Sequence, residues 1–282
     1  MSDKVSIIIP ARNEQFLAKT VDDIIRNATG NIEIIVILDG YWDSLPDHPG
    51  LTIIHRSQAK GMRHAINSAA AIAKGKYLLK TDAHCMFAHG FDETLKANCD
   101  GDWIVIPARF SLDPEAWGVK HTGKARVDYH YLCHPTNGKK DDDPGMHARV
   151  WNERARQRLN NPEYNIDEEM SFQGSCWFMP RKHFTDFLGG MDEQNYGTFI
   201  QEPQEIGLKT WLGGGKVMVN KLTWYAHLHK GKTYGRGYSI SKNSMVKGSA
   251  YSTDFWMNNR WTGRKHDLEW LIDKFAPVPT WE

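Results

Sequence analysis

Residues 5–14 read Val-Ser-Ile-Ile-Ile-Pro-Ala-Arg-Asn-Glu, a short apolar run that ends at a proline and passes into a polar turn. Apolar residues that do not alternate with polar ones are typical of a strand buried on both faces of a parallel sheet. The polar residues would then lie at the carboxyl end of that strand, which is the edge where open α/β sheets bind ligands. This stretch therefore predicts both a fold class and the edge of the sheet that carries the function.

Helical and strand patterns alternate downstream of this strand as far as residue 107. Apolar residues recur at helical spacing in residues 15–27 and 60–74. Further short apolar runs occupy residues 32–38, 51–55, 77–80 and 103–107. Strands separated by helices indicate an α/β fold with a mostly parallel, Rossmann-like central sheet and helices on both faces.

The regular pattern weakens between residues 108 and 170 and then returns. Proline, glycine and the charged run at 139–143 predict a loop-rich insertion, with one amphipathic stretch near residues 147–159. Beyond it we expect further regular elements, namely strands at 171–179, 216–220 and 223–229 and helices at 181–188 and 202–212.

The composition limits the classes of protein that the chain can belong to. Its 282 residues suit one large α/β domain with a modest extension. The 35 Lys and Arg against 34 Asp and Glu argue against a protein built mainly to hold nucleic acid. Four scattered cysteines without a CxxC pair indicate reduced thiols. With neither a signal-peptide pattern nor a long apolar run, we expect a cytoplasmic protein that does not span a membrane.

Several common motifs of α/β proteins are absent from the sequence. The turn after the first predicted strand lacks the GxGxxG pattern of dinucleotide sites. Residues 213–216 read Gly-Gly-Gly-Lys without the other residues of a Walker motif, and HExxH and GxSxG do not occur. Dinucleotide-dependent, P-loop and serine-hydrolase chemistries are therefore not favoured.

Two residues of metal-binding type follow the predicted strand at 77–80. Asp82 and His84 are two positions apart, so that on an extended segment both side chains point to one face. A carboxylate and an imidazole make half of a site for manganese or magnesium. The spacing alone leaves a structural role equally open, but a position at a strand end in the middle of the sheet favours function.

Short motifs in a fixed order carry a family resemblance. The first half contains Ile7-Ile-Ile-Pro-Ala-Arg-Asn-Glu14, Ile37-Leu-Asp-Gly40, Gly61-Met-Arg-His-Ala-Ile-Asn67 and Asp82-Ala-His84. The second half contains Gly189-Gly-Met-Asp192, Glu202-Pro-Gln-Glu205 and Ala226-His227. Together they resemble glycosyltransferase family 2 and its relatives of the GT-A fold. The histidine in the metal motif resembles the polypeptide N-acetylgalactosaminyltransferases in particular.

The resemblance implies an activity and a domain plan. It implies a metal-dependent hexosyl- or N-acetylhexosaminyl-transferase that moves a sugar from a UDP-sugar to a hydroxyl. Residues 1–229 would form the GT-A domain, with a nucleotide-binding half (1–107), the insertion (108–170) and an acceptor half (171–229). Residues 230–282 would add a lid loop and an extension rich in basic and aromatic residues.

The resemblance also implies a set of donor-binding residues. Asp82, His84 and His227 would hold Mn²⁺ or Mg²⁺, which bridges the two phosphates and neutralises charge as the nucleoside diphosphate leaves. A histidine packed on a strand is the alternative interpretation of His227. The remaining expected nucleotide contacts are Pro10, Ala11, Arg12, Asn13, Glu14, Asp39, Gly61, Arg63 and Asn67.

Two glutamates are the expected catalytic residues. Glu202 falls where inverting members of the family carry an acidic pair, but the second position here is Pro203. The spacing of Glu202 and Glu205 fits the retaining, polypeptide-modifying relatives better, which favours retention. If the reaction inverts, Glu202 is the best available base. Glu205 could equally be a charge on a helix surface.

The segment after His227 predicts a lid. Residues 230–238 contain three glycines and three cations, which suits a loop that closes over a diphosphate, with Lys230 and Tyr234 as contacts. A solvated surface loop is the alternative.

The acceptor is left open by the sequence. Basic and aromatic residues alternate in the tail, so DNA carrying hydroxylated bases is one hypothesis, and a protein or a glycan is another. A tail that packs on the catalytic domain is the commonest explanation of such a composition. A nucleotidyltransferase or a non-catalytic nucleotide-sugar-binding protein would share the fold.

Overall fold

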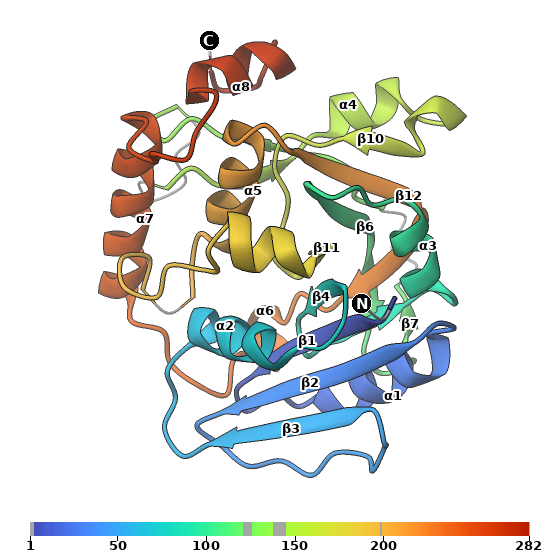
Figure 1. Ribbon diagram of the computed structural model, residues 1–282. Coiled ribbons are helices and arrows are strands. Elements are labelled where there is room, and N and C mark those ends of the chain that lie inside the picture. Colours follow the sequence, from blue (N-terminus) through green and yellow to red (C-terminus); the bar gives the residue numbers. More distant parts are fainter. Residues whose placement is uncertain (1–2, 121–125, 138–144, 198, 282) are drawn as a thin grey trace.

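The chain folds around one large mixed sheet in a computed structural model that describes residues 3–120, 126–137, 145–197 and 199–281 (Figure 1). The charged run at 139–143, which we expected to lie in a loop, falls outside the described residues. The strands follow the order β10-β12-β6-β11-β4-β1-β2-β3 across the sheet. Their bounds are β1 Val5–Ala11, β2 Ile32–Asp39, β3 Leu51–Arg56, β4 Tyr77–Thr81, β6 Trp103–Asp113, β10 Ile166–Glu168, β11 Cys176–Pro180 and β12 Lys216–His227.

Strand direction changes across the sheet. Strands β1 to β4 are parallel, as predicted, and so are β6 and β12. Strand β11 lies between β4 and β6 and is antiparallel to both. Short strands complete the architecture: β5 Cys85–Phe87 pairs with β12, β7 Gly118–Val119 with β6, and β8 His130–Leu132 with β9 Ala148–Val150. The predicted α/β fold is confirmed, with a mixed sheet that includes an antiparallel central strand.

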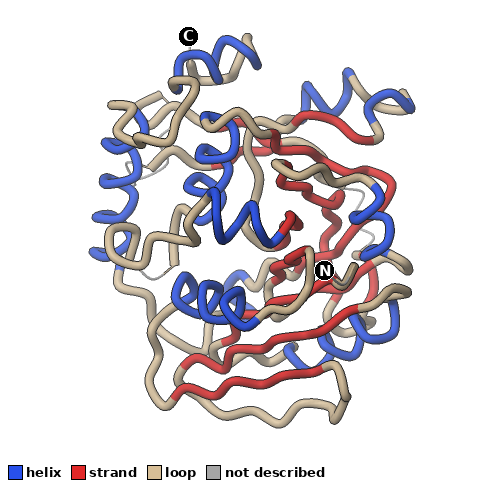
Figure 2. The backbone as a smooth tube through the Cα atoms, in the orientation of Figure 1, coloured by secondary structure: helices blue, strands red, loops and turns tan. Residues whose placement is uncertain are grey.

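Helices cover both faces of the sheet (Figure 2). The helices are α1 Leu17–Asn27, α2 Met62–Ile72, α3 Phe91–Ala97, α4 Asn152–Gln157, α5 Glu202–Leu212, α6 Gly231–Tyr234, α7 Lys242–Met257 and α8 Leu268–Phe275, with short helical turns at Pro162–Tyr164 and His183–Phe187. Strand β1 shows why both faces are needed. Ile8 joins the core cluster under α2 and α5, whereas Ile7 and Ile9 join the cluster under α1 and α3.

Two predicted elements differ from the structure. The strands expected at 216–220 and 223–229 form one strand, β12, with an irregularity between Asn220 and Trp224. The strand expected at 171–179 begins only at Cys176, and residues 173–175 line a cavity.

The predicted lid, residues 230–238, contains only the short helix α6, whereas the tail beyond it forms the helices α7 and α8. Trp256 of α7 and Leu271 and Phe275 of α8 are buried in the core cluster that contains α5. The rings of Trp256 and Phe275 therefore serve in packing. None of the helices in the described ranges is both long enough and apolar enough to cross a membrane.

Candidate active site

A cavity of about 830 Å³ opens at the carboxyl ends of the parallel strands. The residues that follow β1, β2 and β4 all contribute to its wall, as does His227 at the end of β12. Residues between 235 and 245, ahead of and within α7, also line the cavity. The volume is that of a site for a substrate of a few hundred daltons.

Asp82, His84 and His227 meet in this cavity, and their ligand atoms all lie within 4.8 Å of one another. The His227 Nε2 atom is 3.2 Å from Nε2 of His84 and 3.3 Å from Oδ2 of Asp82. Asp82 and His84 lie in the turn between β4 and β5, and His227 is paired in register with Cys85 of β5. The short β5–β12 ladder therefore brings together residues that are 143 positions apart.

The protonation of this cluster suits a metal ion. Burial lowers the pKa of His227 from its ordinary value of 6.5 to about 3, so that its imidazole is neutral. Burial opposes ionisation of Asp82, but the Lys80 ammonium and the two histidines hold its pKa well below the usual range. Neutral imidazoles and an ionised carboxylate are the forms that bind metals. Two imidazole nitrogens and one carboxylate oxygen converging on one point fit Mn²⁺ or another divalent ion.

Glu14 connects this cluster to the segment after β12. Its Oε2 atom lies 3.3 Å from Nδ1 of His84 and also forms an ion pair with the Lys230 ammonium. A carboxylate thus lies beside the second ring nitrogen of His84, although the two atoms are not hydrogen-bonded. Lys230 is thus anchored directly beside the three-residue cluster.

The first polar turn forms one wall of the cavity. Pro10, Ala11, Arg12 and Glu14 line the cavity, as predicted from the motif, whereas Asn13 does not. The Asn13 amide instead donates a hydrogen bond of 3.1 Å to the Gly237 carbonyl, which ties this turn to the C-terminal segment.

Asp39 and Gly61 also line the cavity, as expected. The two Asp39 oxygens accept hydrogen bonds from the backbone N–H groups of Lys60 (2.9 Å) and Gly61 (2.8 Å). The Arg56 guanidinium lies 3.3 Å away and adds an ion pair. Asp39 therefore shapes the turn before α2 in addition to facing the cavity.

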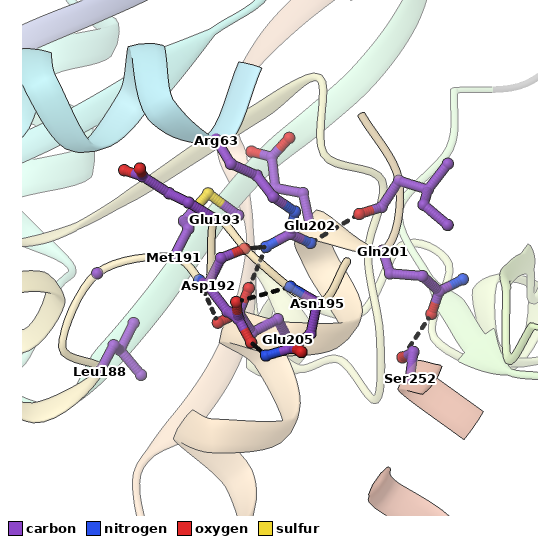
Figure 3. A network of polar contacts seen from close by, with 12 residues as sticks. Arg63, Leu188, Met191, Asp192, Glu193, Asn195, Gln201, Glu202, Glu205 and Ser252 are labelled. Carbon is purple, nitrogen blue, oxygen red and sulfur yellow. Dashed lines mark hydrogen bonds and ion pairs between the residues drawn. The ribbon is translucent and has the colours of Figure 1, made fainter. Parts of the chain in front are cut away.

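Arg63 and Asn67 lie outside the cavity wall, although we expected nucleotide contacts from both. Arg63 is 1% exposed and forms a buried ion pair with Glu205, and its Nη2 atom donates to the Ile200 carbonyl at 2.7 Å (Figure 3). The Asn67 amide group bonds the backbone of Met191 through both its nitrogen and its oxygen. The helix α2 turns these two side chains toward α5, where they hold the chain that follows β11.

The two glutamates of α5 have different surroundings. Glu202 lines the cavity; its Oε1 atom accepts a hydrogen bond of 2.6 Å from the Trp177 indole, and its Oε2 lies 3.3 Å from the Lys80 nitrogen. Burial raises the pKa of Glu202, and Lys80 counteracts part of that effect. Glu205 is 0% exposed and lies outside the cavity wall, bound to Arg63 and Lys209. Glu205 is therefore neither at the reacting centre nor on a helix surface, contrary to both expectations.

Of the two predicted lid contacts, one lines the cavity and the other does not. Lys230 lines the cavity, but Tyr234 packs its ring against Phe16, with 5.5 Å between the centroids, outside the cavity wall. Tyr238 lines the cavity in its place, and the Arg12 guanidinium stacks over its ring at 4.7 Å.

Lys80 and Tyr238 are cavity residues that the sequence analysis did not single out. A lysine at the fourth position of an apolar strand, Tyr77-Leu-Leu-Lys80, is the signal that could have identified the first, because lysines are rarely buried without a partner. Tyr238 carried no comparable signal, since its position depends on how residues 230–240 fold back over the first turn.

Comparison with known proteins gives consistent matches. A family model described as glycosyl transferase family 2 matches residues 6–187. N-acetylgalactosaminyltransferase 4 of Drosophila melanogaster is 24% identical over 274 residues, which cover 90% of this chain and 40% of that protein. Polypeptide N-acetylgalactosaminyltransferase 6 of Bos taurus is 23% identical over 261 residues, which cover 86% and 40%. The chain thus spans about 40% of the length of these curated relatives.

A solved structure shares the fold. The crystal structure of GalNAc-T7 with UDP, GalNAc and Mn²⁺ matches with a TM-score of 0.71 at 18% identity, covering 97% of this chain and 56% of that one. Similarity at this level of identity concerns the path of the chain, which is that of GT-A glycosyltransferases.

Proposed function

The chain belongs to glycosyltransferase family 2 and is a glycosyltransferase, and from this premise we propose a donor, a metal and a stereochemical course. The donor is a UDP-sugar, the cofactor is Mn²⁺ or Mg²⁺, and the sugar passes to a hydroxyl group with retention of configuration. The observation that carries the proposal is the convergence of Asp82, His84 and His227 in the cavity at the strand ends.

The three clustered residues would hold the metal through Asp82 Oδ2 and an imidazole nitrogen of each histidine. When bound, the ion neutralises the diphosphate and stabilises it as a leaving group. Glu14 places a negative charge beside the ring of His84, and Lys230 and Arg12 supply positive charge in the cavity wall. The curated relatives named above are N-acetylgalactosaminyltransferases, which supports an N-acetylhexosamine as the first donor sugar to test.

Retention is supported by the state of the carboxylates in the cavity wall. Within the described residues these are Glu14, Asp39, Asp82 and Glu202, and each already accepts a hydrogen bond or an ion pair. Direct displacement with inversion needs a carboxylate or another base that is poised to take the proton of the acceptor hydroxyl. Trp177 and Lys80 each donate to Glu202 and favour its ionised form, which makes it a weaker base than burial alone would.

The acceptor belongs to this proposal only as a class. It is a hydroxyl-bearing molecule, whether a protein side chain, a glycan or a hydroxylated DNA base. Packing of Trp256 in the core and of Phe255 and Trp261 against it favours the first two, because these rings are then not available to stack on bases.

The proposal is tested by incubating the protein with a panel of UDP-sugars and Mn²⁺ and measuring UDP release with and without EDTA. We expect release that needs the metal and prefers one sugar, and the configuration of the released or transferred sugar follows from the NMR coupling of its anomeric proton. UDP binding is measured in parallel by calorimetry.

Each outcome has a distinct meaning. UDP binding that is independent of Mn²⁺ would overturn the metal assignment, and an inverted product would overturn retention. Absence of both UDP binding and release would point to another nucleotide, or to a binding protein that has kept the fold.

A further inference from the structure

Lys80 is a buried cation in the floor of the cavity that the proposed chemistry does not use. It is the fourth residue of β4 and is 1% exposed, with its side chain reaching the cavity wall. A lysine in the middle of a buried strand is stable only if its ammonium group is fully paired.

The Lys80 ammonium has a partner for each of its three protons. Nζ donates to Oδ1 of Asp82 at 2.8 Å, to the Gly174 carbonyl at 2.5 Å and to Oε2 of Glu202 at 3.3 Å. An ammonium group has three donors and no acceptor. No proton therefore remains for a substrate, and any role of Lys80 is exerted through its neighbours.

The sheet register places a second donor beside it. Lys80 on β4 is paired with Trp177 on β11, so that both side chains point to the same face of the sheet. The Trp177 indole donates to Oε1 of Glu202, while Lys80 holds Oε2. The Glu202 carboxylate is thus fixed at both oxygens by two neighbouring strands.

The Asp82 carboxylate is held at one oxygen only. Lys80 occupies Oδ1, which leaves Oδ2 directed at His227, 3.3 Å away, and at His84. Two carboxylates therefore converge on one ammonium, and only the one from Asp82 also faces the histidines.

We propose that Lys80 is a positioning residue that keeps the Glu202 carboxylate away from the metal site, so that Asp82 rather than Glu202 supplies the carboxylate ligand. This inference rests on the proposed function, because it presupposes an ion at Asp82, His84 and His227. A second carboxylate on the ion would cancel its charge and fill a position that the diphosphate needs. Lys80 thereby reserves Glu202 for the sugar side of the cavity.

The test compares Lys80→Met with Lys80→Met/Glu202→Gln in two binding measurements. Mn²⁺ affinity without nucleotide is measured by electron paramagnetic resonance, and UDP affinity at saturating Mn²⁺ by calorimetry. In Lys80→Met we expect Mn²⁺ to bind as tightly as in the wild type or more tightly, and UDP to bind about tenfold more weakly. In the double variant UDP affinity should return to near the wild-type value, because an amide does not compete for the ion.

Lys209→Met is the matched control, since Lys209 also pairs with a glutamate of α5 but lies outside the cavity wall. Both affinities should be unchanged in this variant. If Lys80 served only packing, Lys80→Met would lower the melting temperature but would not weaken UDP binding while Mn²⁺ binding is kept.

The remaining outcomes decide against one proposal or the other. The positioning role is wrong if Lys80→Met binds Mn²⁺ and UDP like the wild type, or if it loses both affinities and Glu202→Gln restores neither. If Lys80→Met does not fold, the double variant, which carries no unpaired Glu202 charge, must fold and bind UDP; otherwise the inference fails. A wild-type protein that binds neither Mn²⁺ nor UDP would instead refute the proposed function itself.

Discussion

Two clusters of opposite charges each include a glutamate of α5, and only one of these clusters lines the cavity. The cavity cluster consists of Lys80, Asp82 and Glu202, and the closed cluster of Arg63 and Glu205. Lys80 and Arg63 are each 1% exposed, and each is paired with a glutamate of α5. In Figure 3 the Glu202 carboxylate points away from the pair formed by Arg63 and Glu205.

The comparison shows that burial and pairing of charge do not by themselves identify a functional site. Glu202 and Glu205 are three positions apart, so they lie one above the other on nearly the same side of the helix. Their surroundings differ because Glu202 is the first residue of α5, next to the cavity, and Glu205 lies one turn farther in. The closed cluster binds backbone carbonyls and the Tyr196 ring, which the Arg63 guanidinium covers at 4.4 Å.

The largest effect should come from removing one of the proposed metal ligands on the cavity side. We expect His84→Ala to lower UDP-sugar turnover by about 1,000-fold, since a metal ion contributes several kcal/mol to stabilising the leaving group. The melting temperature should change little, because His84 lies in a turn. His89→Ala, a histidine outside the cavity wall, is the control and should retain full turnover. Equal turnover in His84→Ala and His89→Ala would show that His84 in the cavity is no more important for turnover than a histidine outside it.

A substitution in the closed cluster should lower the free energy of unfolding but leave turnover nearly unchanged. Arg63→Met leaves Glu205 buried without its strongest partner, which we expect to reduce the free energy of unfolding by about 3 kcal/mol. This value is at the low end for such pairs because Lys209 and the backbone N–H of Asp192 still donate to Glu205. Turnover per folded molecule should stay within about threefold of the wild type, a change of less than 1 kcal/mol.

Denaturant unfolding and initial rates on the same sample separate these two effects. The double variant Arg63→Met/Glu205→Gln should recover part of the lost stability, since it removes the unpaired charge. A large fall in turnover at unchanged stability would support a nucleotide contact by Arg63, as its sequence motif suggested.

His183, which packs against α5 outside the cavity, should make the free energy of unfolding depend on pH. It accepts or donates a hydrogen bond of 2.9 Å with Thr210, and burial lowers its pKa from 6.5 to about 4. Between these values the unfolded chain binds a proton that the folded chain does not, so stability falls as the pH falls. The loss from this residue should be about 2 kcal/mol between pH 6.5 and 5.

The measurement is the slope of unfolding free energy against pH in the wild type and in His183→Gln. The slope should be shallower in the variant over this range, while the pH profile of turnover per folded molecule stays the same. An identical slope in both proteins would mean that His183 is protonated in the folded state near its ordinary pKa.

The sheet of the first half could be predicted because its information is local. The apolar runs before Pro10, Asp39 and Asp82 define strands β1, β2 and β4, and the polar residues after them line the cavity. A strand inserted from far along the chain leaves no such local signal. The apolar run of β11 gives no indication that it lies antiparallel between β4 and β6.

The candidate site was predicted in its residue types better than in its orientations. Asp82, His84 and His227 could be grouped from a resemblance, and the β5–β12 ladder is what joins them in space. The sequence could not tell that Arg63 and Glu205 face each other behind the cavity, because a helix start and a motif do not fix which neighbour a side chain meets. A lysine in an apolar strand was a local signal for Lys80, but two of its partners, Gly174 and Glu202, come from distant segments that the sequence does not place.

The smallest predicted effect concerns Lys230, at the outer edge of the cavity side. Its ammonium pairs with Glu14, which in turn contacts His84, so it adds positive charge beside the proposed diphosphate. We expect Lys230→Met to raise the KM for the donor about tenfold and to change kcat less, because a charged hydrogen bond contributes about 1.5 kcal/mol or more. Lys232→Met is the matched control, since Lys232 lies two residues farther on, in α6, but outside the cavity wall. If both variants raise the KM equally, the effect comes from overall charge, and Lys230 has no specific role in binding the donor.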